Sequence, residues 1–320
     1  MSPEKPNDKR LPRTKRAKNP PRFTLVERDF EILHAVLSNR FLSTRQVWWL
    51  FPDSSEKNLT VRLRYLYHHG YLDRIQLPVS SSQEGLIYAM TEKGAGLLAE
   101  HDGVDRKQIK WNRYLNKVQP THIQHLLAIN DMLISYQHAL TRAKSQGELK
   151  DFLIIRGDPK QHKLTVQLMD KDGHRRNKSV IPDAILLLQP PEGEHGVYFI
   201  EVDRGTMSTG RWQEKVEVYR EFTQSAQLEA KWHSHWAILL TVTTSEKRLV
   251  SIAEKTVASG GRRGYWFTTF DGIAPDSALA KLWVRGTDLY RLRNEQVLKQ
   301  AEITDIKRLS LLDALRFDNG

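Results

Sequence analysis

The stretch Tyr198-Phe199-Ile200-Glu201-Val202-Asp203-Arg204 decides how the second half of this chain is interpreted. An apolar run of this length indicates a strand, and strand side chains alternate between two faces. Glu201 and Asp203 therefore share one face, while Ile200 and Val202 occupy the other. Two neighbouring carboxylates in an apolar strand are costly to bury unless a cation or a basic group compensates their charge. The stretch therefore predicts an acidic site whose negative charge is balanced by a cation or a basic group.

A third carboxylate, Asp183, follows Pro182 and lies eighteen residues before Glu201, also in an apolar strand. Hard oxygen ligands of this kind suit Mg²⁺ or Mn²⁺, which can lower the pKa of a bound water and stabilise charge on a phosphodiester. The candidate metal ligands are Asp183, Glu201 and Asp203. The alternative is a structural cluster in which Arg204 or Lys215 neutralises the acids.

The surrounding sequence predicts a mixed, partly parallel sheet, because strands and helices are interspersed. The expected strands are Phe152–Ile155, Leu164–Leu168, Val180–Leu188, Val197–Val202, Ala237–Val242 and Tyr265–Phe270. The expected helices are Thr121–Lys144, Arg211–Gln227 and Ser245–Ala258. The fold class is therefore α/β in this half and α+β overall.

The N-terminal half has the pattern of a winged helix-turn-helix domain. Three short helices are expected to begin at the capping residues Thr24, Ser43 and Asp53. Two strands separated by the loop Ser80–Gly85 form the wing, and Thr91 caps a closing helix. Three helices, a hairpin and a further helix are the order of a winged helix-turn-helix.

In such a domain the third helix enters the major groove, with its apolar stripe turned to the core. Here the stripe is Leu59, Leu63 and Leu66. The candidate DNA-binding residues are Lys57, Asn58, Val61, Arg62, Arg64, Tyr65 and Arg74. The alternative is a protein-interaction module whose basic residues are only a solvated face.

Composition favours a polyanionic partner. The 320 residues include 49 Lys and Arg against 38 Asp and Glu, for a net charge of +11. The absence of cysteine excludes thiolate nucleophiles and Cys-ligated zinc. No apolar run reaches the roughly 18 residues that span a bilayer, and no signal peptide is evident. We expect a cytoplasmic protein that binds no membrane.

We expect five segments along the chain. They are a disordered basic arm at 1–22, the winged helix-turn-helix at 23–101, a linker at 102–120, the α/β domain at 121–290 and a C-terminal extension at 291–320.

The acidic pattern resembles the signature of the PD-(D/E)XK nuclease superfamily. Asp183 and Glu201 match the two acids that hold the metal in that superfamily. Asp203 stands where a lysine is expected. The resemblance implies that Lys215, on the next helix, supplies this function and joins Asp183, Glu201 and Asp203 as the candidate catalytic residues.

The wider arrangement is similar to the replication-relaxation family of bacterial plasmids and integrative elements. The likeness rests on Tyr88–Gly94, His125–Asp131 and Phe199–Thr206 and covers roughly Thr24 to Asp288. It implies a role in plasmid replication, DNA relaxation or mobilisation.

The leading interpretation is a double-stranded DNA-binding protein of a mobile element whose PD-(D/E)XK nuclease-like domain cleaves or nicks DNA with Mg²⁺ or Mn²⁺. The alternative is a non-catalytic winged-helix regulator or replication accessory factor with a degenerate nuclease fold. Whether the chain is a metal-dependent endodeoxyribonuclease thus stays open at this stage. Besides DNA, the candidate partners are further replication or mobilisation proteins and a second copy of the chain.

Overall fold

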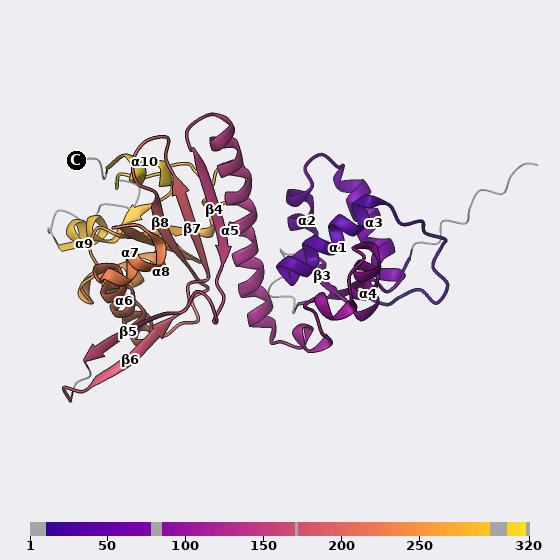
Figure 1. Cartoon of the computed structure of the whole chain (residues 1–320), viewed down its shortest axis with the longest axis horizontal. Coiled ribbons are helices and arrows are strands. Elements are labelled where there is room, and N and C mark those ends of the chain that lie inside the picture. Colours follow the sequence, from indigo (N-terminus) through magenta and orange to yellow (C-terminus); the bar gives the residue numbers. More distant parts are fainter. Residues whose placement is uncertain (1–10, 78–84, 170–171, 295–305, 318–320) are drawn as a thin grey trace, which may run out of the picture. The chain divides into compact units, whose positions relative to one another are not determined.

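The computed structural model describes residues 11–77, 85–169, 172–294 and 306–317 (Figure 1). The chain divides into two compact units, Met1–Asn130 and Asp131–Gly320. The division falls inside helix α5 (Pro120–Ser145). Helices and a multi-stranded mixed sheet confirm the predicted α/β class. None of the helices in the described ranges is long and apolar enough to cross a membrane.

Unit 1 contains four helices, three strands and two 3-10 turns in its described ranges. They are α1 (Glu27–Asn39), β1 (Phe41–Ser43), α2 (Thr44–Leu50), α3 (Glu56–His68), β2 (Leu72–Ile75), β3 (Ile87–Met90), α4 (Glu92–His101), η2 (Arg106–Gln108) and η3 (Arg113–Asn116). The strands form an antiparallel sheet in the order β1-β3-β2. The helices and hairpin follow the order expected above, whereas β1 was not predicted. Residues 80–84 of the expected wing loop lie outside the described residues.

Capping chemistry fixes where these helices begin. Ser43 accepts from the Gln46 amide while the Gln46 side chain accepts from the Ser43 amide, as predicted. Thr91 caps α4 as expected. The other two starts were wrong by two residues: α1 begins after Val26, whose amide donates to Asp29, and α3 begins after Ser55.

The expected arm and linker differ from the structure. Residues 11–22 lie against α3 and β2, where Arg16 donates to the Tyr67 and Leu72 carbonyls and the Ala17 amide donates to His68. The described part of the arm is therefore held by the unit, and residues 1–10 lie outside the described ranges. The segment 102–120 also packs on unit 1, since Asn116 donates to the carbonyl of Met90.

The start of α5 belongs to the core of unit 1. Ile123 and Leu127 pack with Phe41, Ile87 and Ala89. These apolar contacts explain why the division falls at Asn130 and not within the expected linker.

Unit 2 is built on a six-stranded sheet in the order β11-β10-β9-β8-β7-β4. Its strands are β4 (Asp151–Arg156), β7 (Ala184–Gln189), β8 (Gly196–Asp203), β9 (Ala237–Thr243), β10 (Tyr265–Thr269) and β11 (Val284–Arg285). β8, β9 and β10 run parallel, and β7 runs antiparallel to β8. The sheet is mixed, as the sequence predicts.

Helices cover both faces of this sheet. Figure 1 shows α6 (Thr209–Gln224), α7 (Ala226–Trp232) and α8 (Glu246–Ala258) on one side and the part of α5 that belongs to unit 2 along the other. The predicted single helix over 211–227 is interrupted at Ser225, which caps α7. Phe199 and Val197 of β8 pack with Trp212 and Tyr219 of α6 on the first face. On the other face the Tyr198 hydroxyl donates to the carbonyl of Leu311.

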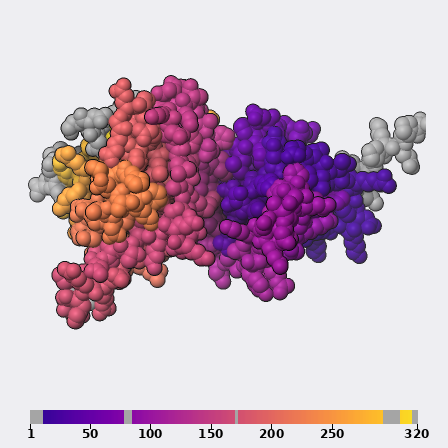
Figure 2. All heavy atoms as spheres, in the orientation of Figure 1, coloured from indigo at the N-terminus to yellow at the C-terminus, as the bar shows by residue number. Residues whose placement is uncertain are grey.

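A two-stranded ribbon projects from unit 2 (Figure 2). It consists of β5 (Leu164–Met169) and β6 (Arg175–Val180). The predicted strand over Val180–Leu188 is wrong in one respect: Val180 ends β6, and the main sheet resumes only at Ala184. Pro182 lies in this break, because proline cannot donate a hydrogen bond to a strand ladder.

The C-terminal segment completes unit 2. Helix η4 (Phe270–Gly272), helix α9 (Gly286–Asn294) and helix α10 (Leu311–Phe317) follow β10, and Trp283 pairs with Leu309 through a bridge. The expected extension 291–320 therefore packs on the unit in its described ranges. Residues 295–305 and 318–320 are not described.

Candidate functional site

Asp183 and Glu201 are neighbours across two antiparallel strands. Asp183 directly precedes β7, whose first residue, Ala184, pairs with Ile200 of β8. The Asp183 amide donates to Ile200 (2.9 Å), and its carboxylate accepts from the amide of Val202 (2.7 Å). These two hydrogen bonds hold Asp183 against β8, close enough for its carboxylate to act on Glu201.

Both oxygens of the Glu201 carboxylate accept hydrogen bonds from α6. Lys215 Nζ lies 2.5 Å from Oε2, and the Tyr219 hydroxyl lies 2.6 Å from Oε1. Glu201 is only 2% exposed. Lys215 and Tyr219 stand one helical turn apart, which places both side chains on the same face of α6.

Burial raises the pKa of Glu201, and the Asp183 carboxylate adds to this, while Lys215 and Tyr219 oppose it. Burial lowers the pKa of Lys215, but Glu201 and Asp183 together outweigh that effect and raise it. Lys215 therefore remains a cation beside a carboxyl group that binds its proton more tightly than usual.

Asp203 has a separate set of partners. Its Oδ2 accepts from Thr243 (2.7 Å) on β9 and from Arg248 Nε (2.8 Å) on α8, and Oδ1 accepts from Arg248 Nη2 (3.2 Å). This two-pronged contact is the geometry in which a guanidinium binds a carboxylate most strongly. Since α6 and α8 cover the same face, Glu201 and Asp203 do share it, as strand alternation predicts.

The backbone at Asp183 is held by the end of β4. Gly157 donates its amide to the carbonyl of Asp183 (3.0 Å), and a Cβ on Gly157 would lie 1.8 Å from the carbonyl oxygen of Pro182. Glycine is therefore required at this close approach. Burial lowers the pKa of the adjacent Arg156 to about 10, although the Asp183 carboxylate acts to raise it.

Thr241 lies beside Glu201 on the other side. The two residues are register partners in β8 and β9. The Thr241 hydroxyl is fully buried and has no hydrogen-bond partner among the described residues. A buried polar atom of this kind calls for an explanation such as a bound ion or water.

Among the described residues of this site, Asp183 before β7 and Glu201 in β8 offer carboxylate oxygens, with the Thr241 hydroxyl next to Glu201. Such a set of oxygen donors fits a hard divalent ion. Asp203 is engaged by Arg248 and Thr243. Within the described ranges, Asp183, Glu201 and Asp203 do not form a group whose ligand atoms all lie within 4.8 Å of one another. The structure therefore brings Asp183, Glu201 and Lys215 together and leaves Asp203 in a neighbouring cluster.

The candidate DNA-binding residues of unit 1 fall into two classes. Lys57 and Asn58 at the start of α3 are exposed, while Val61, Arg64 and Tyr65 are partly exposed. Leu59, Leu63 and Leu66 are buried, as predicted.

Arg62 and Arg74 are instead engaged within the unit. Arg62 forms hydrogen bonds with both oxygens of Asp29, whose side chain is buried, and donates to the Thr24 carbonyl. Arg74 lies over the Tyr67 ring at 4.3 Å and donates to the Arg13 carbonyl. Both guanidinium groups therefore support the fold of unit 1.

Sequence reasoning missed Thr241, Thr243, Arg248 and Gly157. The two threonines have the same two-residue spacing in β9 that Glu201 and Asp203 have in β8, which was a usable signal. No local sequence signal marked Arg248 or Gly157. Their roles depend on contacts between distant segments, namely α8 reaching Asp203 of β8 and β4 pairing with β7.

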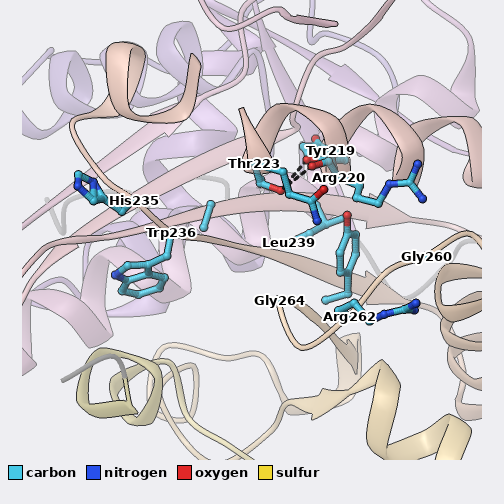
Figure 3. Close-up of a pocket in the computed structure, with 12 residues that line it drawn as sticks. Tyr219, Arg220, Thr223, His235, Trp236, Leu239, Gly260, Arg262 and Gly264 are labelled. Carbon is cyan, nitrogen blue, oxygen red and sulfur yellow. Dashed lines mark hydrogen bonds between the residues drawn. The ribbon is translucent and has the colours of Figure 1, made fainter. Parts of the chain in front are cut away.

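A pocket of about 240 Å³ lies near this site but is distinct from it (Figure 3). Arg220, His235, Trp236 and Arg262 are among its lining residues. Tyr219 lines it as well, yet none of the candidate acids does. The candidate acids therefore lie outside this pocket.

Comparison with known families gives one finding. The sequence model described as replication-relaxation matches residues 33–234, more than half of the chain. The match includes Asp183, Glu201, Asp203 and Lys215 and ends before β9. Comparisons with curated proteins and with solved structures find no match.

Proposed function

Because the chain belongs to the replication-relaxation family, we propose that it binds duplex DNA through unit 1 and cleaves or nicks DNA through unit 2 with a divalent metal ion. The family description indicates a role in the replication or relaxation of plasmids or mobile elements. The observation that carries the proposal is the convergence of Asp183, Glu201 and Lys215.

Each residue of this site has a separate role in the proposed reaction. Asp183 and Glu201 would hold the ion, which would supply an activated water and stabilisation of charge on the phosphodiester. Lys215 stays protonated beside Glu201 and supplies a positive charge near the scissile phosphate. Tyr219 orients the Glu201 carboxylate through its hydrogen bond.

DNA binding is supported by the helix order of unit 1 and the net charge of +11. Lys57 and Asn58 are exposed at the N-terminal end of α3, the end that reads base edges in helix-turn-helix proteins. Arg64 lies on the same helix and is partly exposed. We assign phosphate contact to Lys57 and base contact to Asn58 and Arg64.

Fluorescence anisotropy with duplex DNA at several salt concentrations tests this assignment. The affinity should fall steeply with salt, and Lys57→Ala should reduce the slope by about one. Arg64→Ala should cost roughly 1–3 kcal/mol and change sequence preference. An affinity that does not depend on salt would exclude DNA binding by this unit.

Calorimetry with Mn²⁺ tests the metal. Wild type should bind the ion, and Asp183→Asn should lose one equivalent of binding without loss of fold. Asp271→Asn removes an exposed carboxylate elsewhere in unit 2 and is the matched control. Equal Mn²⁺ binding by wild type and Asp183→Asn would exclude the proposed ligand set.

A second function is favoured by one observation. Both oxygens of Glu201 already accept hydrogen bonds from the protein, which also describes a structural ion pair. On this alternative the chain is a DNA-binding accessory factor that does not cleave. Salt-dependent DNA binding without Mn²⁺ binding would support it.

A further inference from the structure

Two histidines and an aspartate meet on the surface of unit 1. His34 Nε2 lies 3.1 Å from Asp102 Oδ1, and His101 Nδ1 lies 3.0 Å from the same oxygen. His34 is on α1, and the other two are at the end of α4. In the described part of the chain this is the one group of three His, Asp or Glu residues whose ligand atoms all lie within 4.8 Å of one another.

Two of the three separations between ligand atoms are close to those of a metal-bound set, and all three are within 4.8 Å. Zinc holds nitrogen and oxygen ligands at about 2.0–2.1 Å in a tetrahedron, so neighbouring ligand atoms lie about 3.3 Å apart. The observed 3.0 and 3.1 Å differ from this by a few tenths of an ångström. Small side-chain shifts would therefore convert the hydrogen-bonded group into a coordination site.

The surroundings of His101 fit the same interpretation. Its second nitrogen, Nε2, lies 3.6 Å from Glu27 Oε2, and its ring stacks on Phe30 with centroids 3.8 Å apart. Metal-binding histidines usually direct the nitrogen that does not bind toward a carboxylate or carbonyl, which fixes the ring. Glu27 occupies that position, and Phe30 restricts the ring's rotation.

We propose that His34, His101 and Asp102 bind a transition-metal ion of the zinc class. Two imidazoles and one carboxylate suit Zn²⁺, Co²⁺ or Ni²⁺ and disfavour Mg²⁺. Their side chains are 44%, 31% and 26% exposed, which leaves the ion open to a solvent ligand. Because the ligands come from α1 and α4, the bound ion links these two helices. The site lies in unit 1 and does not depend on the activity proposed for unit 2.

Titration of the full chain with Co²⁺, followed by visible absorption, tests the site. Wild type should bind one equivalent with the spectrum of a nitrogen- and oxygen-ligated ion, and excess Zn²⁺ should displace it whereas Mg²⁺ should not. His34→Ala and His101→Ala should abolish this binding. Glu27→Gln should weaken it about tenfold, as loss of an outer carboxylate does.

Two controls distinguish this site from other ligands on the chain. His235→Ala removes an exposed histidine of unit 2, and Asp183→Asn removes the candidate metal ligand there. Both should retain the Co²⁺ spectrum. If a histidine variant fails to fold, Asp102→Asn keeps the hydrogen-bonding shape while removing the charge and should still weaken binding. Absence of Co²⁺ binding to wild type, or a spectrum unchanged in His34→Ala, would overturn the proposal.

Discussion

Lys215 and Glu201 form a buried ion pair whose nearest atoms, Nζ and Oε2, lie 2.5 Å apart. Removing one partner of such a pair leaves a charge without compensation. Because Lys215 is one quarter exposed, water recovers part of that loss, and Lys215→Met should lower the free energy of unfolding by about 1–3 kcal/mol at pH 7. Urea denaturation measures this difference.

The same pair predicts a pH dependence. The pKa of Lys215 is raised in the folded state, so its stabilising effect is complete below the ordinary value of 10.5 and is lost as pH rises through the folded pKa. The difference between wild type and Lys215→Met should therefore shrink at alkaline pH. Tyr219→Phe, which removes only a hydroxyl, should cost about 1 kcal/mol. A gap between wild type and Lys215→Met that is constant up to strongly alkaline pH would contradict the ion pair.

Lys57 and Arg62, both on α3, should behave in opposite ways. Lys57→Ala should weaken DNA binding and leave unfolding unchanged, because its side chain is exposed. Arg62→Ala leaves the buried Asp29 carboxylate without its partner and should lower the free energy of unfolding by about 2–4 kcal/mol. Comparing thermal melts with DNA titrations separates the two effects. A melting point unchanged in Arg62→Ala would show that Arg62 is not structural.

Gly157 should tolerate no side chain. A Cβ there would lie 1.8 Å from the Pro182 carbonyl oxygen, so Gly157→Ala must displace the backbone that carries Asp183. We expect a loss of about 1–3 kcal/mol in unfolding free energy and weaker Mn²⁺ binding. Gly210→Ala in α6 is the control, because a Cβ there meets nothing within 4 Å. Equal Mn²⁺ affinity in the two variants would refute a positioning role for Gly157.

His68 should make the packing of residues 11–22 sensitive to acid. Its Nδ1 accepts from the Ala17 amide (3.0 Å), which requires an unprotonated nitrogen. Burial lowers the pKa of His68, and Arg74 and Arg64 lower it further. A lowered histidine pKa contributes stability above the ordinary value of 6.5 that is lost as pH falls through the folded pKa.

A fluorophore attached at Asn19→Cys can follow this change, since the chain has no other cysteine. Its anisotropy should fall as the pH is lowered below 6.5. His68→Gln, which can accept the same hydrogen bond without titrating, should abolish the fall. A pH response that persists in His68→Gln would assign it to another group.

Local patterns predicted most of the elements but not how they meet. Alternation in β8 placed Glu201 and Asp203 on one face, and the resemblance described above pointed to Lys215 on the next helix. Nothing local indicated that Arg248 would engage Asp203, because their contact joins residues forty-five positions apart. The three acids were expected to act together as ligands of one metal ion, but Asp203 is bound by Arg248 and Thr243 instead.

The boundaries of the two units were predicted less well, because they too depend on contacts between residues far apart in the sequence. The basic, proline-rich composition of residues 11–22 suggests disorder, yet Arg16 donates to Tyr67 and Leu72. The apolar positions Ile123 and Leu127 match any amphipathic helix and do not reveal which unit they contact. Long-range contacts therefore determine both the ordered packing of residues 11–22 and the assignment of the start of α5 to unit 1.

Cleavage of supercoiled plasmid is the most direct test of the proposed function. Wild-type protein with millimolar Mg²⁺ or Mn²⁺ should convert the plasmid to nicked or linear DNA. Asp183→Asn and Lys215→Met should lose this activity, whereas Asp271→Asn should retain it. Equal cleavage by wild type and Asp183→Asn, or no cleavage by a wild-type protein that binds the same plasmid, would contradict the account.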